Sequence, residues 1–313
     1  MRELPPVLQT TYSNLLQVHL NRPAFELDGA PFIRKLNNKT YWYANHRAAP
    51  GAPLRQSYLG PDTEEMRARI EEMKRQRRSL ADFREHASAQ VAILRAGGVA
   101  GPDRRTGPIL RALSSSGVFR LGGTLVGTQA FRLYDLVLGV FLTEEAGWVT
   151  QTNDIDIASF EHLSMVIEDT TNPDLVEALS GLGFGPAPTI KHKTPTRWAL
   201  PDASYSVDFL TPSFSADEKP TRLPTLNLWA QSLHYLNFLI RDPMPAVVPY
   251  MEGLLVQIPK PERYAIHKLI VSQVRRGESQ DKKRKDVAQA RSLIWAMIED
   301  RPYELKSALA EAD

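Results

Sequence analysis

The pattern of apolar and polar positions in the first third of the chain predicts two helices around a small β element. Apolar residues recur at helical spacing over residues 8–20. Residues 31–60 hold aromatic β-type runs, K-T-Y-W-Y-A-N and Q-S-Y-L-G, which favour a hairpin or small sheet. Residues 62–96 then predict one long helix that G-G ends. Its cations alternate with Glu, which is typical of a solvated face, with a nucleic-acid contact as the alternative.

A turn-rich segment at 97–108, G-G-V-A-G-P-D-R-R-T-G-P, marks a boundary in the pattern. Beyond it, helix and strand patterns alternate and predict an α/β (α+β) protein with a mixed sheet. The predicted helices are 109–116, 124–138, 173–182, 225–240, 261–276, 284–299 and 302–312, and the predicted strand segments are 118–122, 140–158 and 205–210, with a hairpin between 240 and 261. Trp229 and Trp295 fall at helical spacing, so we expect them in the core.

This organisation predicts three parts. Residues 1–98 form the N-terminal helix, the small β element and the long helix; residues 105–220 form the core; and residues 221–313 form a mainly helical region.

Three acidic residues interrupt apolar strand patterns. In T-N-D-I-D-I-A, Asp154 and Asp156 are two residues apart, so a strand places both on one face. Asp208 lies in Y-S-V-D-F-L, where a buried carboxylate needs a partner. If the two strands are neighbours, three carboxylates converge, and such hard oxygen ligands favour Mg²⁺ (or Mn²⁺). The alternatives for the D-x-D are an exposed loop, a calcium site or a glycosyltransferase metal motif. The alternative for Asp208 is a carboxylate that pairs with an arginine or accepts hydrogen bonds from the backbone.

A second candidate element is G-G-T, formed by Gly122, Gly123 and Thr124. We expect it to follow a strand and open a helix, where free N–H groups and close backbone approach suit a phosphate. The alternative is a structural turn, because a Gly-Gly turn before a helix is common.

Composition narrows the function classes. The chain has 313 residues, 42% of them hydrophobic and 24% charged, and no cysteine. The absence of cysteine excludes disulfides, thiol catalysis and cysteine-ligated zinc. The N-terminus lacks the apolar stretch of a signal peptide and no apolar run is long enough for a bilayer, so we expect a cytoplasmic protein.

Charge is distributed unevenly although the net charge is only +2. Residues 150–218 carry three Lys and Arg against eleven Asp and Glu, whereas residues 260–291 carry ten against four. An acidic segment facing a basic one suits a site for metal and phosphate; two separate solvated faces are the alternative.

Together these motifs resemble the DNA polymerase beta-like nucleotidyltransferase superfamily, in particular a bacterial nucleotidyltransferase-like branch similar to toxin and abortive-infection enzymes. The segments that carry the resemblance are F-R-L-G-G-T-L-V-G-T-Q-A-F (119–131), T-N-D-I-D-I-A (152–158), V-D-F-L-T-P (207–212), P-K-P-E-R-Y-A-I-H-K-L-I-V-S (259–272) and K-R-K-D-V-A-Q-A (283–290). About thirty residues separate Thr124 from Asp154, more than family members often have.

The resemblance implies a Mg²⁺-dependent transfer of NMP from an NTP to an acceptor hydroxyl, with release of pyrophosphate. Gly122, Gly123 and Thr124 would hold the triphosphate. Asp154 and Asp156 would bind both metals, and Asp208 would complete the catalytic metal site and help to activate the acceptor.

The resemblance also gives the basic C-terminal segment a role. Lys268, and as a second such element Lys285, would reach the triphosphate; an ion pair on the helix surface is the alternative for Lys285. The implied partners are an NTP, an acceptor that is tRNA, another RNA or a protein, and an antitoxin. Two rival functions stay open: a D-x-D glycosyltransferase that uses a nucleotide sugar, and a non-catalytic nucleotide- or RNA-binding module on the same fold.

Overall fold

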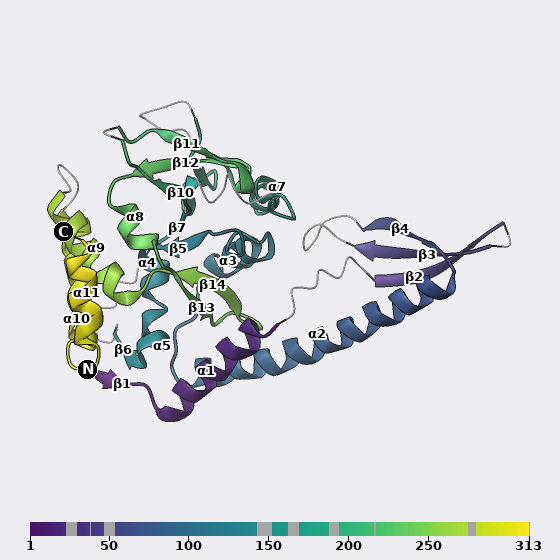
Figure 1. Ribbon diagram of the computed structural model, residues 1–313, viewed down its shortest axis with the longest axis horizontal. Coiled ribbons are helices and arrows are strands. Elements are labelled where there is room, and N and C mark those ends of the chain that lie inside the picture. Colours follow the sequence, from purple (N-terminus) through teal and green to yellow (C-terminus); the bar gives the residue numbers. More distant parts are fainter. Residues whose placement is uncertain are drawn as a thin grey trace.

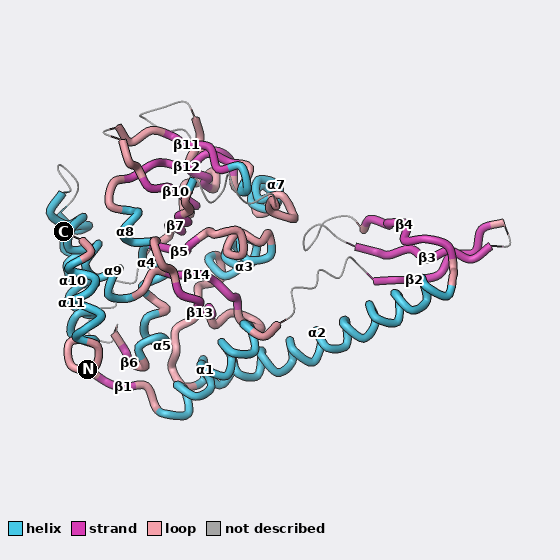
Figure 2. The backbone as a smooth tube through the Cα atoms, viewed as in Figure 1, coloured by secondary structure: helices cyan, strands magenta, loops and turns pink. Residues whose placement is uncertain are grey.

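The computed structural model is a mixed helix-and-sheet protein built around a mixed sheet, which confirms the predicted α/β class (Figures 1 and 2). The structure describes residues 1–22, 30–37, 39–46, 54–142, 152–161, 169–187, 194–215, 217–274 and 280–312.

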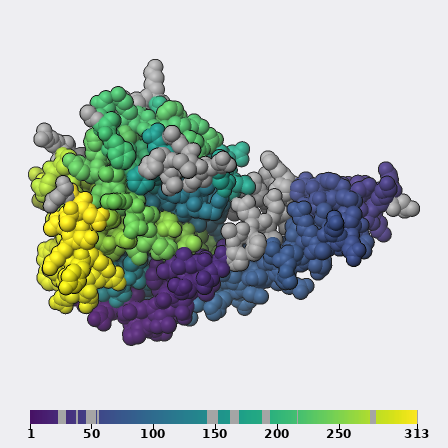
Figure 3. All heavy atoms as spheres, in the orientation of Figure 1, coloured from purple at the N-terminus to yellow at the C-terminus, as the bar shows by residue number. Residues whose placement is uncertain are grey.

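The N-terminal part is a long helix with a small sheet at its far end. Helix α2 (Glu64–Ala96) begins where the Thr63 hydroxyl accepts a hydrogen bond from the Met66 N–H at 3.2 Å. Helix α1 (Pro6–Leu20) packs on the C-terminal part of α2 through a buried apolar cluster. The remainder of α2 projects from the body of the protein and carries the antiparallel sheet β2 (Ala30–Leu36), β3 (Lys39–His46) and β4 (Arg55–Pro61) (Figures 1 and 3).

The central sheet brings the acidic strands together. Its order is β11-β12-β10-β7-β5; in addition, β9 pairs with part of β10, and β8 pairs with β9. Strand β10 is parallel to β7 and β12, and the other pairs are antiparallel. The bounds are β5 (Thr124–Val126), β7 (Asp154–Ala158), β8 (Gly185–Pro186), β9 (Arg197–Ala199), β10 (Ser206–Pro212), β11 (Pro220–Leu223) and β12 (Leu228–Leu233).

Alternation within these strands separates an apolar face from the acidic one. Ile155, Ile157, Val207 and Phe209 are fully buried in the main core, together with Leu125 of β5. Because side chains of a strand alternate, the acidic residues between them point to the other face of the sheet. The short helices around this core are α3 (Thr106–Ser115), α4 (Gly127–Phe131), α5 (Tyr134–Leu138), α7 (Leu175–Gly181) and α8 (Leu236–Ile240), with the 3₁₀ turn η2 (Pro224–Leu226).

The C-terminal part consists of a hairpin and three helices. The predicted hairpin is formed by β13 (Met244–Val248) and β14 (Leu254–Ile258). Helices α9 (Pro261–Val274), α10 (Gln280–Met297) and α11 (Pro302–Ala310) follow, and the strand pair β1 (Arg2–Glu3) and β6 (Val140–Phe141) lies near them (Figure 1). The main buried cluster extends from Ile109 to Leu293, so core and C-terminal helices share it.

Three predicted elements are wrong. Residues 118–122 form turns rather than a strand, and Thr124–Val126, predicted as the start of a helix, is strand β5. In the predicted helix 225–240, Leu228–Leu233 is strand β12, and only the last five residues are α-helical, as α8. Thr124–Val126 and Leu228–Leu233 are short apolar runs. Such a run can form a strand when another strand lies next to it and completes its hydrogen bonds.

Domain boundaries at 98 and 220 stay a prediction. Among the described residues, no helix combines the length and the apolar character needed to cross a membrane.

Candidate functional site

Two acidic residues lie directly opposite each other on neighbouring strands. In the parallel register of β7 and β10, Asp208 pairs with Asp156, and Ser206 pairs with Asp154. The side chains of paired residues point to the same face of a sheet. The register therefore gathers all three predicted carboxylates on one face.

Each of the outer carboxylates has a hydrogen-bonding partner. The Ser206 hydroxyl donates to Oδ1 of Asp154 at 2.7 Å. Arg197 of β9 donates from Nε to Oδ1 of Asp208 at 2.6 Å and from its terminal nitrogen to Oδ2 at 2.7 Å. This is a bidentate ion pair, in which the Asp208 side chain is 13% exposed and the Arg197 side chain is 49% exposed. Arg197 is thus a direct counter-charge of Asp208 in a site with three acids.

The surroundings of Asp156, the central carboxylate, disfavour its ionised form. Burial raises the pKa of Asp156 to about 7, and repulsion by Asp208 and Asp154 contributes to this rise, while Lys268 and Arg197 oppose it. Burial also raises the pKa of Asp208, although its hydrogen bonds with Arg197 act in the opposite direction. A cation bound between these carboxylates would relieve this cost.

The glycine that adjoins the acids is Gly127, which sequence analysis missed. It is the first residue of α4, directly after β5, and has φ of +64°, in the left-handed region. A Cβ built there would lie 2.2 Å from Oδ2 of Asp156. Only a residue without a side chain allows this approach of backbone to carboxylate.

The predicted G-G-T lies one strand earlier and does not open a helix. Gly122 has φ of +87° in the turn before β5, and a Cβ at Gly123 would meet the Val118 carbonyl oxygen at 2.8 Å. Thr124 is buried and pairs with Ala158 rather than with an acidic residue. These contacts explain the glycines as parts of a turn, and their role in nucleotide binding stays a prediction.

Helices α9 and α10 present lysines to the acidic face. The Lys268 ammonium donates to Oδ1 of Asp286 at 2.6 Å, with side-chain exposures of 15% and 5%. Burial and the charge of Lys268 lower the pKa of Lys285, whereas Asp286, Asp154 and Asp156 raise it. Both lysines therefore lie within the electrostatic reach of the carboxylates, as the uneven charge of the sequence suggested.

The C-terminal helices also hold the turn at Gly127. The Tyr264 hydroxyl lies 2.9 Å from the Gly127 carbonyl oxygen and 3.0 Å from Oε1 of Gln289. Nε2 of Gln289 donates to the Thr128 hydroxyl at 3.4 Å. Thus α9 and α10 fix the backbone beside Asp156, a role that no local sequence signal reveals.

The donor set suits a hard divalent cation, but the three carboxylates are not yet arranged around one position. Among the residues that the structure describes, no group of three His, Cys, Asp or Glu is placed to hold a metal ion. The hydrogen bonds of these carboxylates give the reason: both oxygens of Asp208 accept from Arg197, and Oδ1 of Asp154 accepts from Ser206. Metal binding at all three would require Asp208 to share or exchange this partner.

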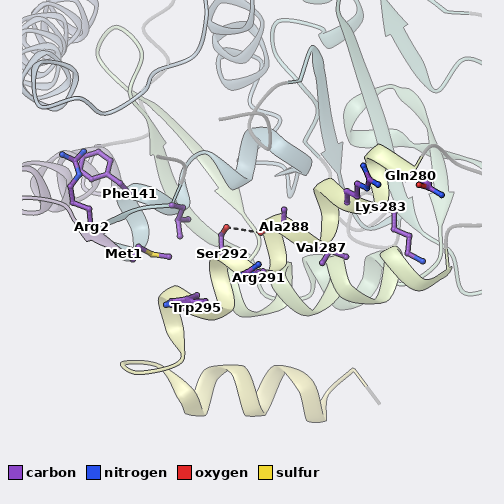
Figure 4. A pocket seen from close by; sticks show the side chains of 12 residues that line it. Met1, Arg2, Phe141, Gln280, Lys283, Val287, Ala288, Arg291, Ser292 and Trp295 are labelled. Atoms are coloured by element: carbon purple, nitrogen blue, oxygen red, sulfur yellow. Dashed lines mark hydrogen bonds between the residues drawn. The ribbon is translucent and has the colours of Figure 1, made fainter. Parts of the chain in front are cut away.

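A groove of about 940 Å³ runs along another face of α10 (Figure 4). It is lined by Met1, Arg2, Phe141, Leu142, Gln280, Lys283, Arg284, Val287, Ala288, Arg291, Ser292 and Trp295. None of the three carboxylates lines it, so it is distinct from the acidic site. The Trp295 side chain is 62% exposed and Trp229 is 37% exposed, which makes the prediction that both lie in the core wrong.

The fold and the site define an α/β protein in which two paired strands gather carboxylates beside a glycine turn. Two helices that carry lysines lie close enough to affect these carboxylates electrostatically. A family model described as "Nucleotidyltransferase" matches residues 104–313, two thirds of the chain and all of this site. The chain belongs to this nucleotidyltransferase family. No curated protein and no solved structure matches it in the other two comparisons.

Proposed function

We propose that this protein transfers an NMP group from an NTP to an acceptor hydroxyl, with release of pyrophosphate, and that it depends on Mg²⁺ or Mn²⁺. Membership of the family supports nucleotidyl transfer in general. The observation that carries the finer proposal is the register of Asp208 opposite Asp156, with Asp154 on the same face.

Asp154, Asp156 and Asp208 are the residues that would hold the metal. They fit it because carboxylate oxygens are the ligands Mg²⁺ takes, and because burial together with their mutual repulsion disfavours ionised Asp156 without a cation. When bound, the metal would neutralise charge on the triphosphate and on the attacking oxygen.

The residues of the protein would position the triphosphate and neutralise part of its charge. Gly127 lets the start of α4 come close to Asp156, and a triphosphate bound there meets backbone rather than a side chain. Lys285 and Lys268 face the same carboxylates and suit the phosphate oxygens. Catalysis of phosphoryl transfer depends mainly on such positioning and charge neutralisation.

The chemical step balances without any other reactant. The acceptor hydroxyl gives its proton to the Asp208 carboxylate, its oxygen forms a bond to the α-phosphorus, and the bond from that phosphorus to the bridging oxygen breaks. Pyrophosphate leaves with the bonding electrons. The raised pKa of Asp208 favours the uptake of this proton.

The test is incubation of the purified protein with each α-labelled NTP, Mg²⁺ and cell extract. We expect release of pyrophosphate together with label in an acceptor, and loss of both with Asp156→Asn. Asp82→Asn is the matched control because Asp82 is exposed on α2, outside the matched family region. Full NTP consumption by Asp156→Asn would contradict the catalytic assignment.

The same experiment separates the rivals. Binding of NTP without release of pyrophosphate would indicate a non-catalytic module, and mass spectrometry that finds an added hexose would indicate a glycosyltransferase. The fraction that carries the label decides whether the acceptor is tRNA, another RNA or a protein. An antitoxin partner, a toxin role and membership of the polymerase beta-like toxin branch stay predictions.

A further inference from the structure

The sheet at the far end of α2 lies outside the matched family region and has two different faces. Trp42 and Ala44 of β3 are buried, and the Trp42 indole N–H donates to Oδ1 of Asp62 at 2.9 Å. The Lys74 ammonium of α2 lies 5.9 Å from the centre of the Trp42 ring. This face is therefore held against the helix.

The opposite face carries four aromatic rings in mutual contact, which we term the aromatic face: Phe32, Tyr41, Tyr43 and Tyr58. Tyr43 pairs with Phe32 on one side and with Tyr58 on the other. The ring centres are 5.9 Å apart for Phe32 and Tyr43, 5.4 Å for Tyr43 and Tyr58, and 6.0 Å for Tyr41 and Tyr58. The Tyr58 side chain is 56% exposed, and the other three rings are partly exposed.

The segment that carries the aromatic face has more basic than acidic residues. Residues 30–61 contain five Lys and Arg and not one Asp or Glu. The Arg34 guanidinium lies 6.0 Å from the centre of the Tyr43 ring. Over residues 30–78, which add the outer part of α2, eleven Lys and Arg stand against five Asp and Glu. This part of the molecule attracts polyanions.

We propose that the aromatic face binds single-stranded nucleic acid by stacking its bases on the exposed rings. Bases stack on aromatic side chains of a sheet while nearby cations contact the phosphates, and a duplex cannot bind in this way because its bases are already stacked. A protein partner explains the exposed rings but not the exclusion of acidic residues over 30–61. The proposal does not depend on the catalytic function, because Figure 1 places the aromatic face at the end of α2, away from β7 and β10.

The test measures binding of the full-length protein to fluorescently labelled oligonucleotides of about 12 nucleotides, by fluorescence anisotropy at physiological salt. The probes are single-stranded RNA, single-stranded DNA of the same sequence, and the RNA duplex. We expect both single strands to bind more tightly than the duplex. A preference between RNA and DNA would identify the sugar contacted and would support stacking equally.

Tyr58→Ala is expected to weaken single-strand binding about tenfold. Tyr58→Leu should weaken it as much, because it keeps apolar area but removes the ring. The matched control is Ile33→Ala: Ile33 is 51% exposed on the same sheet and pairs with Trp42, so it lies on the other face. Circular dichroism and thermal melting should show that all variants fold.

Three results would overturn the proposal. These are equal affinity for duplex and single strand, unchanged affinity in both Tyr58 variants, and the absence of binding. Loss of a dimer in Tyr58→Ala, seen by sedimentation, would assign the aromatic face to a second copy of the chain instead. NTP consumption without nucleic acid should stay unchanged in these variants, so this proposal and the catalytic one fail separately.

Discussion

Gly127 and Asp156 approach each other so closely that a single methyl group at Gly127 would lie 2.2 Å from the Asp156 carboxylate oxygen. Gly127 begins α4 directly after β5, Asp156 lies in β7, and the two are 29 positions apart. The antiparallel register of β5 and β7, which pairs Val126 with Asp156, brings them together. The glycine that lies beside Asp156 is therefore determined by strand pairing and not by its place in a motif.

Gly127→Ala should abolish most nucleotidyl transfer, because the added Cβ displaces either the Asp156 carboxylate or the start of α4. Left-handed strain alone costs about 1 kcal/mol. The control is Gly98→Ala, which carries comparable strain at φ of +92° but has no atom within 4 Å of the added Cβ. Rates of pyrophosphate release and thermal melting compare the two variants. Equal activity in both would show that the contact with Asp156 is unimportant.

Arg197→Ala should make the protein more responsive to metal. Without the arginine, Asp208 loses its two hydrogen bonds and the three carboxylates lose a counter-charge. We expect a melting temperature about 3 °C lower without metal, and a larger rise on addition of Mg²⁺ than in the wild-type protein. Arg222→Ala, which removes an exposed arginine of β11, serves as the control. An identical Mg²⁺-induced shift in wild type and Arg197→Ala would contradict competition between arginine and metal for Asp208.

Lys285→Ala should raise the KM for NTP at little cost in stability, since burial beside Lys268 already disfavours its charge. Lys283→Ala is the control, because Lys283 lines the groove on another face of the same helix. Steady-state kinetics and thermal melting give the two readouts. An unchanged KM in Lys285→Ala would remove this lysine from the nucleotide site.

Lys268→Ala should lower both activity and stability, because buried Asp286 loses the ammonium 2.6 Å away. Removal of one partner of such a pair costs about 3 kcal/mol in the free energy of unfolding. In Lys268→Ala/Asp286→Ala, urea denaturation should show much of this stability restored while activity stays low. Recovery of activity in the double variant would mean that Lys268 acts only as a structural partner.

His19 should make the protein less stable as the pH falls below about 6.5. It is buried beside Phe83, its Nε2 lies 3.0 Å from the Glu252 carbonyl oxygen, and burial lowers its pKa. The unfolded chain then takes up a proton that the folded protein resists, so stability is lost from pH 6.5 downward. Urea midpoints at pH 7.5 and 5.5 should differ less in His19→Gln than in wild type. The same pH dependence in both would show that His19 does not contribute.

The sequence by itself determined which residues can form the site. The alternation in D-I-D-I and V-D-F-L fixes acids on one face and Ile155, Ile157, Val207 and Phe209 on the other, because a strand has a period of two. The long helix α2 was equally readable, since helical periodicity is local. The uneven charge of the two segments also indicated an acidic site faced by basic helices.

Only the tertiary structure decided how these residues meet. Thr124–Val126 is a strand because it pairs with β7, and Leu228–Leu233 is a strand because it pairs with β10 and β11. A short apolar run does not reveal which neighbouring strand it will pair with. The pairing of β5 with β7 places Gly127, and not Gly123, beside Asp156. Strand β9 brings Arg197 into hydrogen-bonding contact with Asp208, and α9 brings the Tyr264 hydroxyl to the Gly127 carbonyl oxygen. These contacts join residues of different strands and helices, so the local sequence pattern around each residue does not predict them.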